Sequence, residues 1–368
     1  MRKNTVLAVC FTAIVFFTLP AIGMTATIPA DPYKQSLESL QNKVPLTYNE
    51  SVRKTIDAYT SQKKRFGEML GLSKYYFPIY EKIFRERGIP DEIKYLSVLE
   101  SSLDANAVSR AGATGPWQFL YEVGKIWGLR INDSIDERKD PVLAANAAAS
   151  YLLDSYNQYG DWLLAIASYN CGKNRVKWAI EDSGGKKDYW SIRKYLPAET
   201  QNYIPAYIAT VYIMNNYQKH DIFPEAGYLA ETETIPVKSV VSFEDISRQS
   251  GVTMNQLIYL NPSYKKLVIN GTETSPRNIV IPVLPTYTYN SLCKMLGLSG
   301  RFIPEPNIPE KAAAPVTTYY IVYYVQEGDT IASIAGKFSG ATEEQIKAAN
   351  SLKTSVLKTG MMLKIRQG

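Results

Sequence analysis

Two patterns of hydrophobic and polar residues divide the chain. From about residue 50 to 220, apolar residues recur three and four positions apart between short polar turns, which is typical of amphipathic helices. From residue 231 onward, alternation predicts short strands at 234–241 and 278–283, with two short helical patterns between them. The same strand, helix, helix, strand order recurs at 323–365. We therefore predict a multi-domain protein with a mainly α domain followed by two small α+β (βααβ) modules.

The segment 91–103 predicts a helix that begins after Pro90 and carries the carboxylate of Glu100 on a largely apolar face. The residues that share this face are Ile93, Leu96, Ser97 and Leu103. Burial among such side chains would raise the carboxyl pKa, as a general acid at neutral pH requires. The same spacing is equally compatible with a structural role, in which Glu100 is a buried acid that is hydrogen-bonded by Ser101 or Ser102.

Ordered motifs around and after this carboxylate resemble those of a known family. They are Glu100 with Ser101, then Ser109, 112–113, 115–119 and, much later, 167–172. In this order the motifs resemble the soluble lytic transglycosylase domain, a lysozyme-like fold, and most closely its membrane-bound lytic murein transglycosylase D type. The resemblance covers roughly residues 50 to 215. Departures such as Pro116 and Ser168 leave the acidic residue of the motif in place.

This resemblance implies cleavage of the β-1,4 bond between N-acetylmuramic acid and N-acetylglucosamine in peptidoglycan glycan strands. Glu100 would act as general acid and then as general base, which yields 1,6-anhydro-N-acetylmuramic acid without added water. The implied substrate-binding residues are Ser109, Gln118, Tyr169 and Asn170, with Ser101, Trp117 and Tyr203 in support. Trp117 could be either a core residue or a sugar-stacking face.

Two other functions stay open at this point. The same fold could house a hydrolytic muramidase of lysozyme type, and a catalytically idle peptidoglycan-binding scaffold belongs to a different class. A hydrolase would need a second carboxylate. Asp104, four residues beyond Glu100, is the obvious candidate in the sequence, but we interpret it as a turn or cap residue.

The C-terminal repeat resembles a LysM module, a small carbohydrate-binding fold. The resemblance implies that Gly328, Asp329, Thr330 and Asn350 contribute to glycan binding. The first copy is degenerate, because 242–245 replaces the Gly-Asp-Thr turn, and it could be a structural adaptor without sugar affinity. Between the copies, four prolines in 304–315 predict a stiff linker.

The first residues predict export. Residues 1–26 resemble a secretory signal, with Arg2 and Lys3 before an apolar stretch, although an uncleaved anchor is the alternative. We therefore expect a location in the periplasm or cell envelope of a bacterium. The predicted domains are 27–225 for catalysis with an N-terminal helical extension, 231–285 for the degenerate module, 286–317 for the connection and linker, and 318–368 for the LysM module.

Composition excludes several classes of protein. Loss of Arg2 and Lys3 with the signal lowers the net charge from +6 to +4, and no run of basic residues with interleaved aromatics suggests a nucleic acid partner. Cys171 and Cys293 are predicted to be buried free thiols. The single histidine, without ligand spacing around it, predicts neither a metal site nor a cofactor. Membrane or envelope association is compatible with the signal, and the sequence does not specify an oligomeric state.

Overall fold

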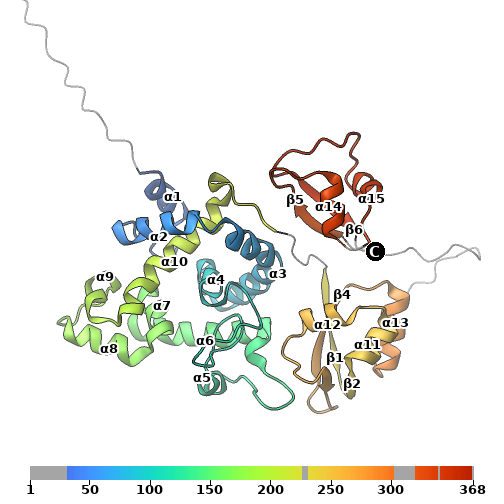
Figure 1. Ribbon diagram of the computed structural model, residues 1–368. Helices are drawn as coiled ribbons and strands as arrows, with labels where there is room; N and C mark the ends of the chain where they lie inside the picture. The colour runs from blue at the N-terminus through green and yellow to red at the C-terminus, as the bar shows by residue number, and fades with distance from the viewer. Residues whose placement is uncertain (1–30, 226–230, 302–319, 339, 367–368) are drawn as a thin grey trace, which may run out of the picture.

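The computed structural model describes residues 31–225, 231–301, 320–338 and 340–366. The predicted signal and most of the predicted linker lie outside these residues. Figure 1 shows a helical body, coloured blue to yellow-green, and two smaller modules in orange and red beside it. Within the described part of the chain, no helix has the length and apolar character needed to cross a membrane.

The helical body is built around α10 (Ala198–Asn216), which packs against α2, α4 and α7. It is buried along nearly its whole length, as expected of a helix that is apolar on every side. The longer helices around it are α1 (Pro32–Leu40), α2 (Glu50–Thr60), α3 (Lys63–Arg87), α6 (Pro141–Tyr159), α7 (Trp162–Cys171) and α8 (Lys173–Asp182). The shorter ones are η1 (Asp91–Lys94), α4 (Tyr95–Ser101), α5 (Tyr121–Ile126), η2 (Glu137–Lys139), α9 (Tyr189–Ile192), η3 (Arg193–Tyr195) and η4 (Tyr217–His220).

Local sequence signals explain where the helices next to the site begin. The Asp140 carboxylate accepts hydrogen bonds from the first turn of α6, whose first residue is Pro141. The Asp161 carboxylate caps α7 in the same way, at 2.7 Å from the Leu164 amide. Gly172, with φ of 85°, ends α7 two residues after Asn170.

The first small module differs from its prediction. Its elements are β1 (Thr232–Val237), β2 (Val240–Ser242), α11 (Phe243–Ser250), α12 (Met254–Leu260), β3 (Val268–Asn270), β4 (Arg277–Pro282) and α13 (Thr286–Met295). The single strand predicted at 234–241 is wrong: the chain breaks after β1, which pairs antiparallel with β4, while β2 pairs with β3. β3 has only three residues, too few to give a periodic signal in the sequence.

The C-terminal module confirms the predicted order, with β5 (Tyr320–Tyr324), α14 (Ile331–Lys337), α15 (Glu343–Ala349) and β6 (Met362–Arg366). The internal repeat also has a structural counterpart. The Asn350 amide pairs with both backbone groups of Lys364 at 2.6 and 2.7 Å, and Asn261 does the same with Val280 at 2.7 Å. Each module therefore ties its second helix to its last strand with the equivalent asparagine.

Candidate active site

Glu100 lies in the last turn of α4, close to where the helix ends. The predicted helix 91–103 begins directly after Pro90 as expected, although its first turn is the 3₁₀ helix η1. Its predicted end is wrong: it stops at Ser101, because Ser102 and Leu103 have φ of 59° and 64°. The predicted apolar environment is confirmed, since Ile93, Leu96, Ser97 and Leu103 are all fully buried. The Glu100 side chain itself is only partly exposed.

The ionisation of Glu100 is controlled by burial and by residues from distant elements. Burial raises the pKa of its carboxyl to about 7, the Tyr203 hydroxyl donates a hydrogen bond that opposes this rise, and the negative charge of Glu199 adds to it. In turn, burial and the nearby carboxylate raise the pKa of Tyr203 well above its usual value, so Tyr203 remains a donor. A carboxyl with a pKa near 7 can both give and accept a proton at neutral pH.

Three hydroxyl groups hold the loop that follows α4 against the helices α4 and α7. Ser97 and Ser101 of α4 donate hydrogen bonds to the Pro116 carbonyl at 2.8 and 3.0 Å, and Tyr169 of α7 donates to the Trp117 carbonyl at 2.7 Å. The predicted supporting residue Ser101 and the predicted substrate residue Tyr169 thus both fix the 115–118 backbone. The charge of Glu100 also acts on Tyr169, which places the two groups near each other.

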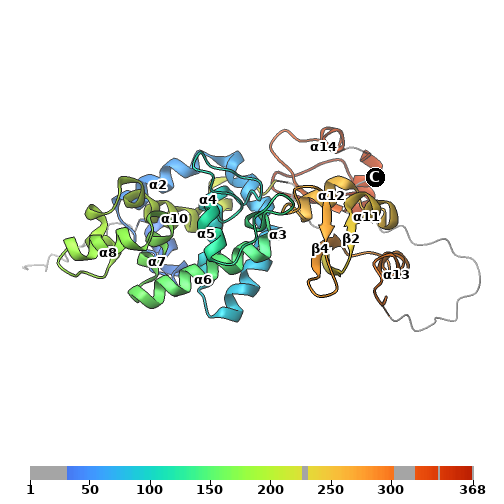
Figure 2. The same cartoon turned by 90° about the horizontal axis from the view of Figure 1, so that it is seen from below.

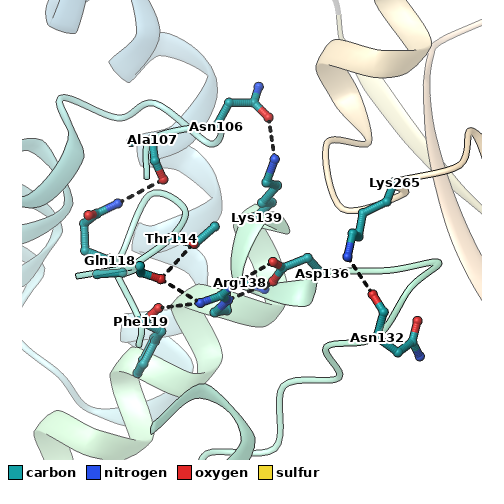
Figure 3. A network of polar contacts seen from close by, with 12 residues as sticks. Asn106, Ala107, Thr114, Gln118, Phe119, Asn132, Asp136, Arg138, Lys139 and Lys265 are labelled. Atoms are coloured by element: carbon teal, nitrogen blue, oxygen red, sulfur yellow. Dashed lines mark hydrogen bonds and ion pairs between the residues drawn. The ribbon is translucent and has the colours of Figure 1, made fainter. Parts of the chain in front are cut away.

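The conformation of this loop depends on Gly115. Its φ of 85° lies in the left-handed region, and a Cβ atom there would lie 1.9 Å from the Arg138 carbonyl oxygen, so no other residue fits. Gln118 is also left-handed, with φ of 48°, and its side-chain amide donates to the carbonyls of Ala107 (3.2 Å) and Gly115 (2.9 Å) (Figure 3). These bonds offset the strain of a non-glycine residue in that conformation.

The remaining predicted substrate residues lie on both sides of this loop. Exposed Ser109 closes the loop tip, with its hydroxyl oxygen 3.0 Å from the Ala113 amide. Asn170 follows Tyr169 on α7 and accepts a hydrogen bond from Thr200 at 2.7 Å. In the described structure no hydrogen bond joins Ser109, Gln118 or Asn170 to Glu100, so their contact with substrate remains a prediction.

The structure decides between the alternatives for Trp117 and Asp104. Trp117 is fully buried and packs edge to face with Tyr80 and Phe84, so it is a core residue and offers no face to a sugar. Asp104 is exposed and its carboxylate accepts the Asn106 amide at 2.8 Å, which is the turn role that we predicted.

Glu199 is the site residue that sequence reasoning missed. It lies in the first turn of α10, is exposed, and accepts a hydrogen bond from Asn170 at 3.3 Å. Because its charge raises the pKa of Glu100, Glu199 is a second carboxylate near the candidate acid. It is four residues before Tyr203, and this helical spacing was the signal that could have revealed it.

In the C-terminal module, most of the predicted glycan-binding residues also have structural roles. Asp329 accepts hydrogen bonds from Tyr323 (2.6 Å) and from Lys337 (2.8 Å), and Thr330 caps α14. The Asn350 side chain bonds both backbone groups of Lys364 and also donates to the Ile346 carbonyl at 2.8 Å. Gly328 has φ of 86° in the exposed turn. Sugar binding by these residues therefore stays a prediction.

The cysteine prediction is confirmed for the free thiols but not for burial, because only Cys293 is buried and Cys171 is partly exposed. Cys171 and Cys293 are both free thiols. Among the described residues, no group of three or more histidine, cysteine or acidic side chains could hold a metal ion.

We predict opposite shifts of the pH–rate profile for two variants. If protonated Glu100 is the acid, the rate falls as the pH rises through its pKa. Tyr203→Phe removes the hydrogen bond that stabilises the ionised Glu100 carboxylate, which raises the pKa of Glu100. The alkaline limb of the profile should therefore move to higher pH by about one unit. Glu199→Gln removes a negative charge and moves the same limb to lower pH. The measurement is kcat/KM on a short soluble glycan between pH 5 and 9.

Tyr207→Phe is the matched control for this prediction. Tyr207 lies one helical turn from Tyr203 on α10, but its hydroxyl donates to the Glu92 carbonyl at 2.9 Å, away from Glu100. Its profile should match that of the wild type. Shifts of both site variants in one direction would show that the titrating group is not Glu100.

Comparison with protein families matches three segments of the chain. Residues 78–192 match the Transglycosylase SLT domain, residues 231–290 the LysM-like domain of lytic transglycosylase MltD, and residues 323–366 the LysM domain. The chain therefore contains an SLT-type domain followed by two LysM-type modules, the combination of domains that is similar to lytic transglycosylases of the MltD type.

Two relatives are similar to all or part of this chain. The chain is 28% identical over 333 residues to membrane-bound lytic murein transglycosylase D of Escherichia coli, which covers 89% of this chain and 71% of the relative. It is 31% identical over 102 residues to a putative tributyltin chloride resistance protein of Alteromonas, which covers 27% of this chain and 49% of that protein.

Solved structures similar to this chain include two lytic transglycosylases. An inactive mutant of lytic transglycosylase Slt from Pseudomonas aeruginosa is 21% identical with a TM-score of 0.34, covering 41% of this chain and 25% of that one. The 70-kDa soluble lytic transglycosylase of Escherichia coli is 18% identical with a TM-score of 0.35, covering 51% and 33%. The chain thus spans a quarter to a third of these structures.

Proposed function

We propose that the protein cleaves the β-1,4 bond between N-acetylmuramic acid and N-acetylglucosamine in peptidoglycan and forms 1,6-anhydro-N-acetylmuramic acid, with Glu100 as acid and then base. One observation carries this proposal: Glu100 has a pKa of about 7 and accepts a hydrogen bond from Tyr203. The protonated form is thus available at neutral pH, and the Tyr203 hydroxyl stabilises the carboxylate left after proton donation.

The proposed reaction returns Glu100 to its starting state. Protonated Glu100 gives its proton to the glycosidic oxygen while the bond from that oxygen to C1 breaks and positive charge develops on the muramic ring. The Glu100 carboxylate then takes the proton of the C6 hydroxyl, whose oxygen attacks C1. Because that hydroxyl belongs to the reacting sugar, it has a high effective concentration compared with external water.

Glu199 favours hydrolysis as the second candidate function. Hydrolytic glycosidases use two carboxylates, one of which activates water or attacks the sugar. Because the charge of Glu199 raises the pKa of Glu100, Glu199 is the candidate for the second carboxylate of such a reaction. Its exposure and its bond from Asn170 fit a residue that tunes the charge of the groove, and we therefore rank lytic cleavage first.

The mass of the first products separates these two reactions. We expect purified peptidoglycan to release muropeptides that end in 1,6-anhydro-N-acetylmuramic acid, each one water lighter than the hydrolysis product. Glu199→Gln should give the same products, because no water has to be activated. Free reducing ends in the earliest samples, lost in Glu199→Gln, would instead establish a hydrolase.

The modules and the first residues extend the proposal to the cellular setting. The C-terminal LysM module would keep the enzyme on peptidoglycan, which is its expected partner. The relative in Escherichia coli is named as membrane-bound. Together with the signal-like residues 1–26, this supports an exported protein of the bacterial cell envelope, either released into the periplasm or kept at the membrane by an uncleaved signal.

A further inference from the structure

The first small module is joined to the catalytic body through the segment between α5 and η2. Backbone hydrogen bonds run from the Asp136 amide to the Ser263 carbonyl (2.8 Å) and from the Lys265 amide to the Ser134 carbonyl (3.0 Å). Between them, Ile135 and Tyr264 form an antiparallel bridge. The two parts of the chain therefore share a short piece of β-structure, and Figure 2 shows the module beside the helical body.

Side chains strengthen this junction. Ile135 belongs to the catalytic body, yet it is buried and packs in the hydrophobic core of the module. The Lys265 ammonium donates to the Asn132 carbonyl at 2.9 Å, a bond that Figure 3 shows on the far side of the junction from the active-site loop. The module thus anchors 132–136 by both apolar and polar contacts.

The anchored segment continues directly into a buried ion pair. The Asp136 carboxylate accepts hydrogen bonds from the Arg138 guanidinium at 2.7 and 2.9 Å, and both side chains are buried. A buried guanidinium is held firmly only when its donors are satisfied. The remaining nitrogen of the Arg138 guanidinium, Nη1, donates hydrogen bonds to the carbonyls of Gly112 (3.0 Å) and Phe119 (3.2 Å) (Figure 3).

Arg138 therefore contacts both ends of the active-site loop 112–119. Its own carbonyl lies against Gly115, where it leaves no room for a Cβ atom. Next to it, Lys139 donates to the Asn106 side chain at 3.1 Å on the approach to the loop. A continuous series of contacts leads from the module core through Ile135, Asp136 and Arg138 to the loop that packs on Glu100.

The module's own turn gives no sign of a sugar site. The C-terminal module has the exposed turn 328–330, and the first module has Ser242 and Phe243 at this place. Phe243 is fully buried in the core of the first module. The Ser242 hydroxyl donates to the Asp245 carboxylate at 2.6 Å and accepts the Asp245 amide at 3.0 Å. Ser242 and Asp245 therefore bond each other inside the module, whereas Ser263, Tyr264 and Lys265 of the same module contact the catalytic body.

We propose that the module 231–285 is a positioning element for catalysis, which holds the loop 112–119 in register with Glu100 through Ile135, Asp136 and Arg138. Only the expected change in kcat rests on the proposed function. The ordering of the loop by the docked module can be measured without any substrate.

The test compares Ile135→Ser with Ile126→Ser in the full-length chain. Ile126 is a matched control because it is 77% exposed on α5, whereas Ile135 is buried in the junction. Amide hydrogen exchange is the first readout, since the amides of Ser109, Thr114 and Gly115 are all hydrogen-bonded within the loop region. We expect Ile135→Ser to accelerate their exchange about 10-fold or more and Ile126→Ser to leave it unchanged.

Kinetics on a short soluble glycan is the second readout. Displacement of a loop at the reacting centre lowers kcat, so we expect a loss of about 10-fold or more with KM within about twofold. Ile135→Val should restore both exchange and kcat, and sedimentation with insoluble peptidoglycan should be the same for all variants. If the wild type lacks lytic activity the proposed function fails, yet the exchange measurement still decides the positioning role.

A second pair of variants covers the case in which Ile135→Ser does not fold. Lys265→Ala removes only the exposed ammonium contact to Asn132, and Lys266→Ala changes its exposed neighbour. Faster loop exchange in Lys265→Ala alone supports the proposal. Unchanged exchange at 109–119 in every folded junction variant would overturn it, as would a loss of peptidoglycan sedimentation without any change in loop exchange or kcat.

Discussion

Glu100→Gln is expected to lower turnover by at least about 100-fold while the protein still binds glycan. The amide keeps the shape of the side chain, but it can neither donate the proton to the leaving oxygen nor take one back from the C6 hydroxyl. The fold should not suffer, because burial raises the pKa of the Glu100 carboxyl to about 7 and the ionised form is therefore disfavoured in the folded state. The measurement is kcat on a soluble glycan, together with sedimentation on peptidoglycan.

The same variant makes a prediction for stability. Between the unfolded value of 4.5 and about 7, the unfolded chain releases the Glu100 proton while the folded chain keeps it, so the contribution of this group to wild-type stability falls as the pH rises. The amide of Glu100→Gln does not titrate, so the free energy of unfolding of the variant should rise by about 2 to 3 kcal/mol relative to that of the wild type as the pH goes from about 4 to 8.

Asp104→Asn is the control for both measurements. It makes the same carboxyl-to-amide change four residues further on, at an exposed turn. Its turnover and its sedimentation on peptidoglycan should stay close to those of the wild type. Near-normal turnover in Glu100→Gln combined with loss in Asp104→Asn would reverse the assignment of the acid.

Gly115→Ala is expected to destabilise the protein by about 3 kcal/mol or more and to remove most activity. The added Cβ would lie 1.9 Å from the Arg138 carbonyl oxygen, and φ of 85° is unfavourable for alanine. The backbone must move, and the carbonyls of Pro116 and Trp117, which bond the helices α4 and α7, move with it. Urea unfolding and kcat measure the two effects.

Gly112→Ala separates the two causes of this loss. Gly112 has nearly the same backbone conformation, with φ of 81°, but a Cβ atom there would meet nothing within 4 Å. It should therefore show only the conformational penalty, about 1 kcal/mol, and retain most activity. Equal effects of the two substitutions would mean that contact between Gly115 and Arg138 does not hold the loop.

Much of the architecture was accessible from local pattern. Helical periodicity marked the α body, and the apolar residues around Glu100 were predicted correctly because positions three, four and seven apart share one helix face in any context. The repeat of the small modules was also visible, and the equivalent asparagines Asn261 and Asn350 occupy equivalent structural places. The family motifs selected Glu100 from many acidic residues.

Errors arose where a few residues or a single backbone angle decided the structure. The helix that carries Glu100 ends early because Ser102 and Leu103 adopt left-handed backbone angles, which no periodic signal announces. The break after β1 depends on pairing with β3, a strand of three residues. Such short-range features follow from packing, so propensity alone does not predict them.

By itself the sequence determined most of the side chains proposed for the site, but not Glu199: an acid on an apolar helix face, a glycine-rich loop, and tyrosines on later helices. Only the tertiary structure decided how these side chains are hydrogen-bonded and how readily Glu100 ionises. The Tyr203 hydroxyl reaches Glu100 from 103 residues away, Glu199 adds its charge, and Arg138 joins the loop to a module more than a hundred residues later. Hydrogen bonding and desolvation act over a few ångströms in space, whereas sequence patterns report only neighbours within a few turns of the chain.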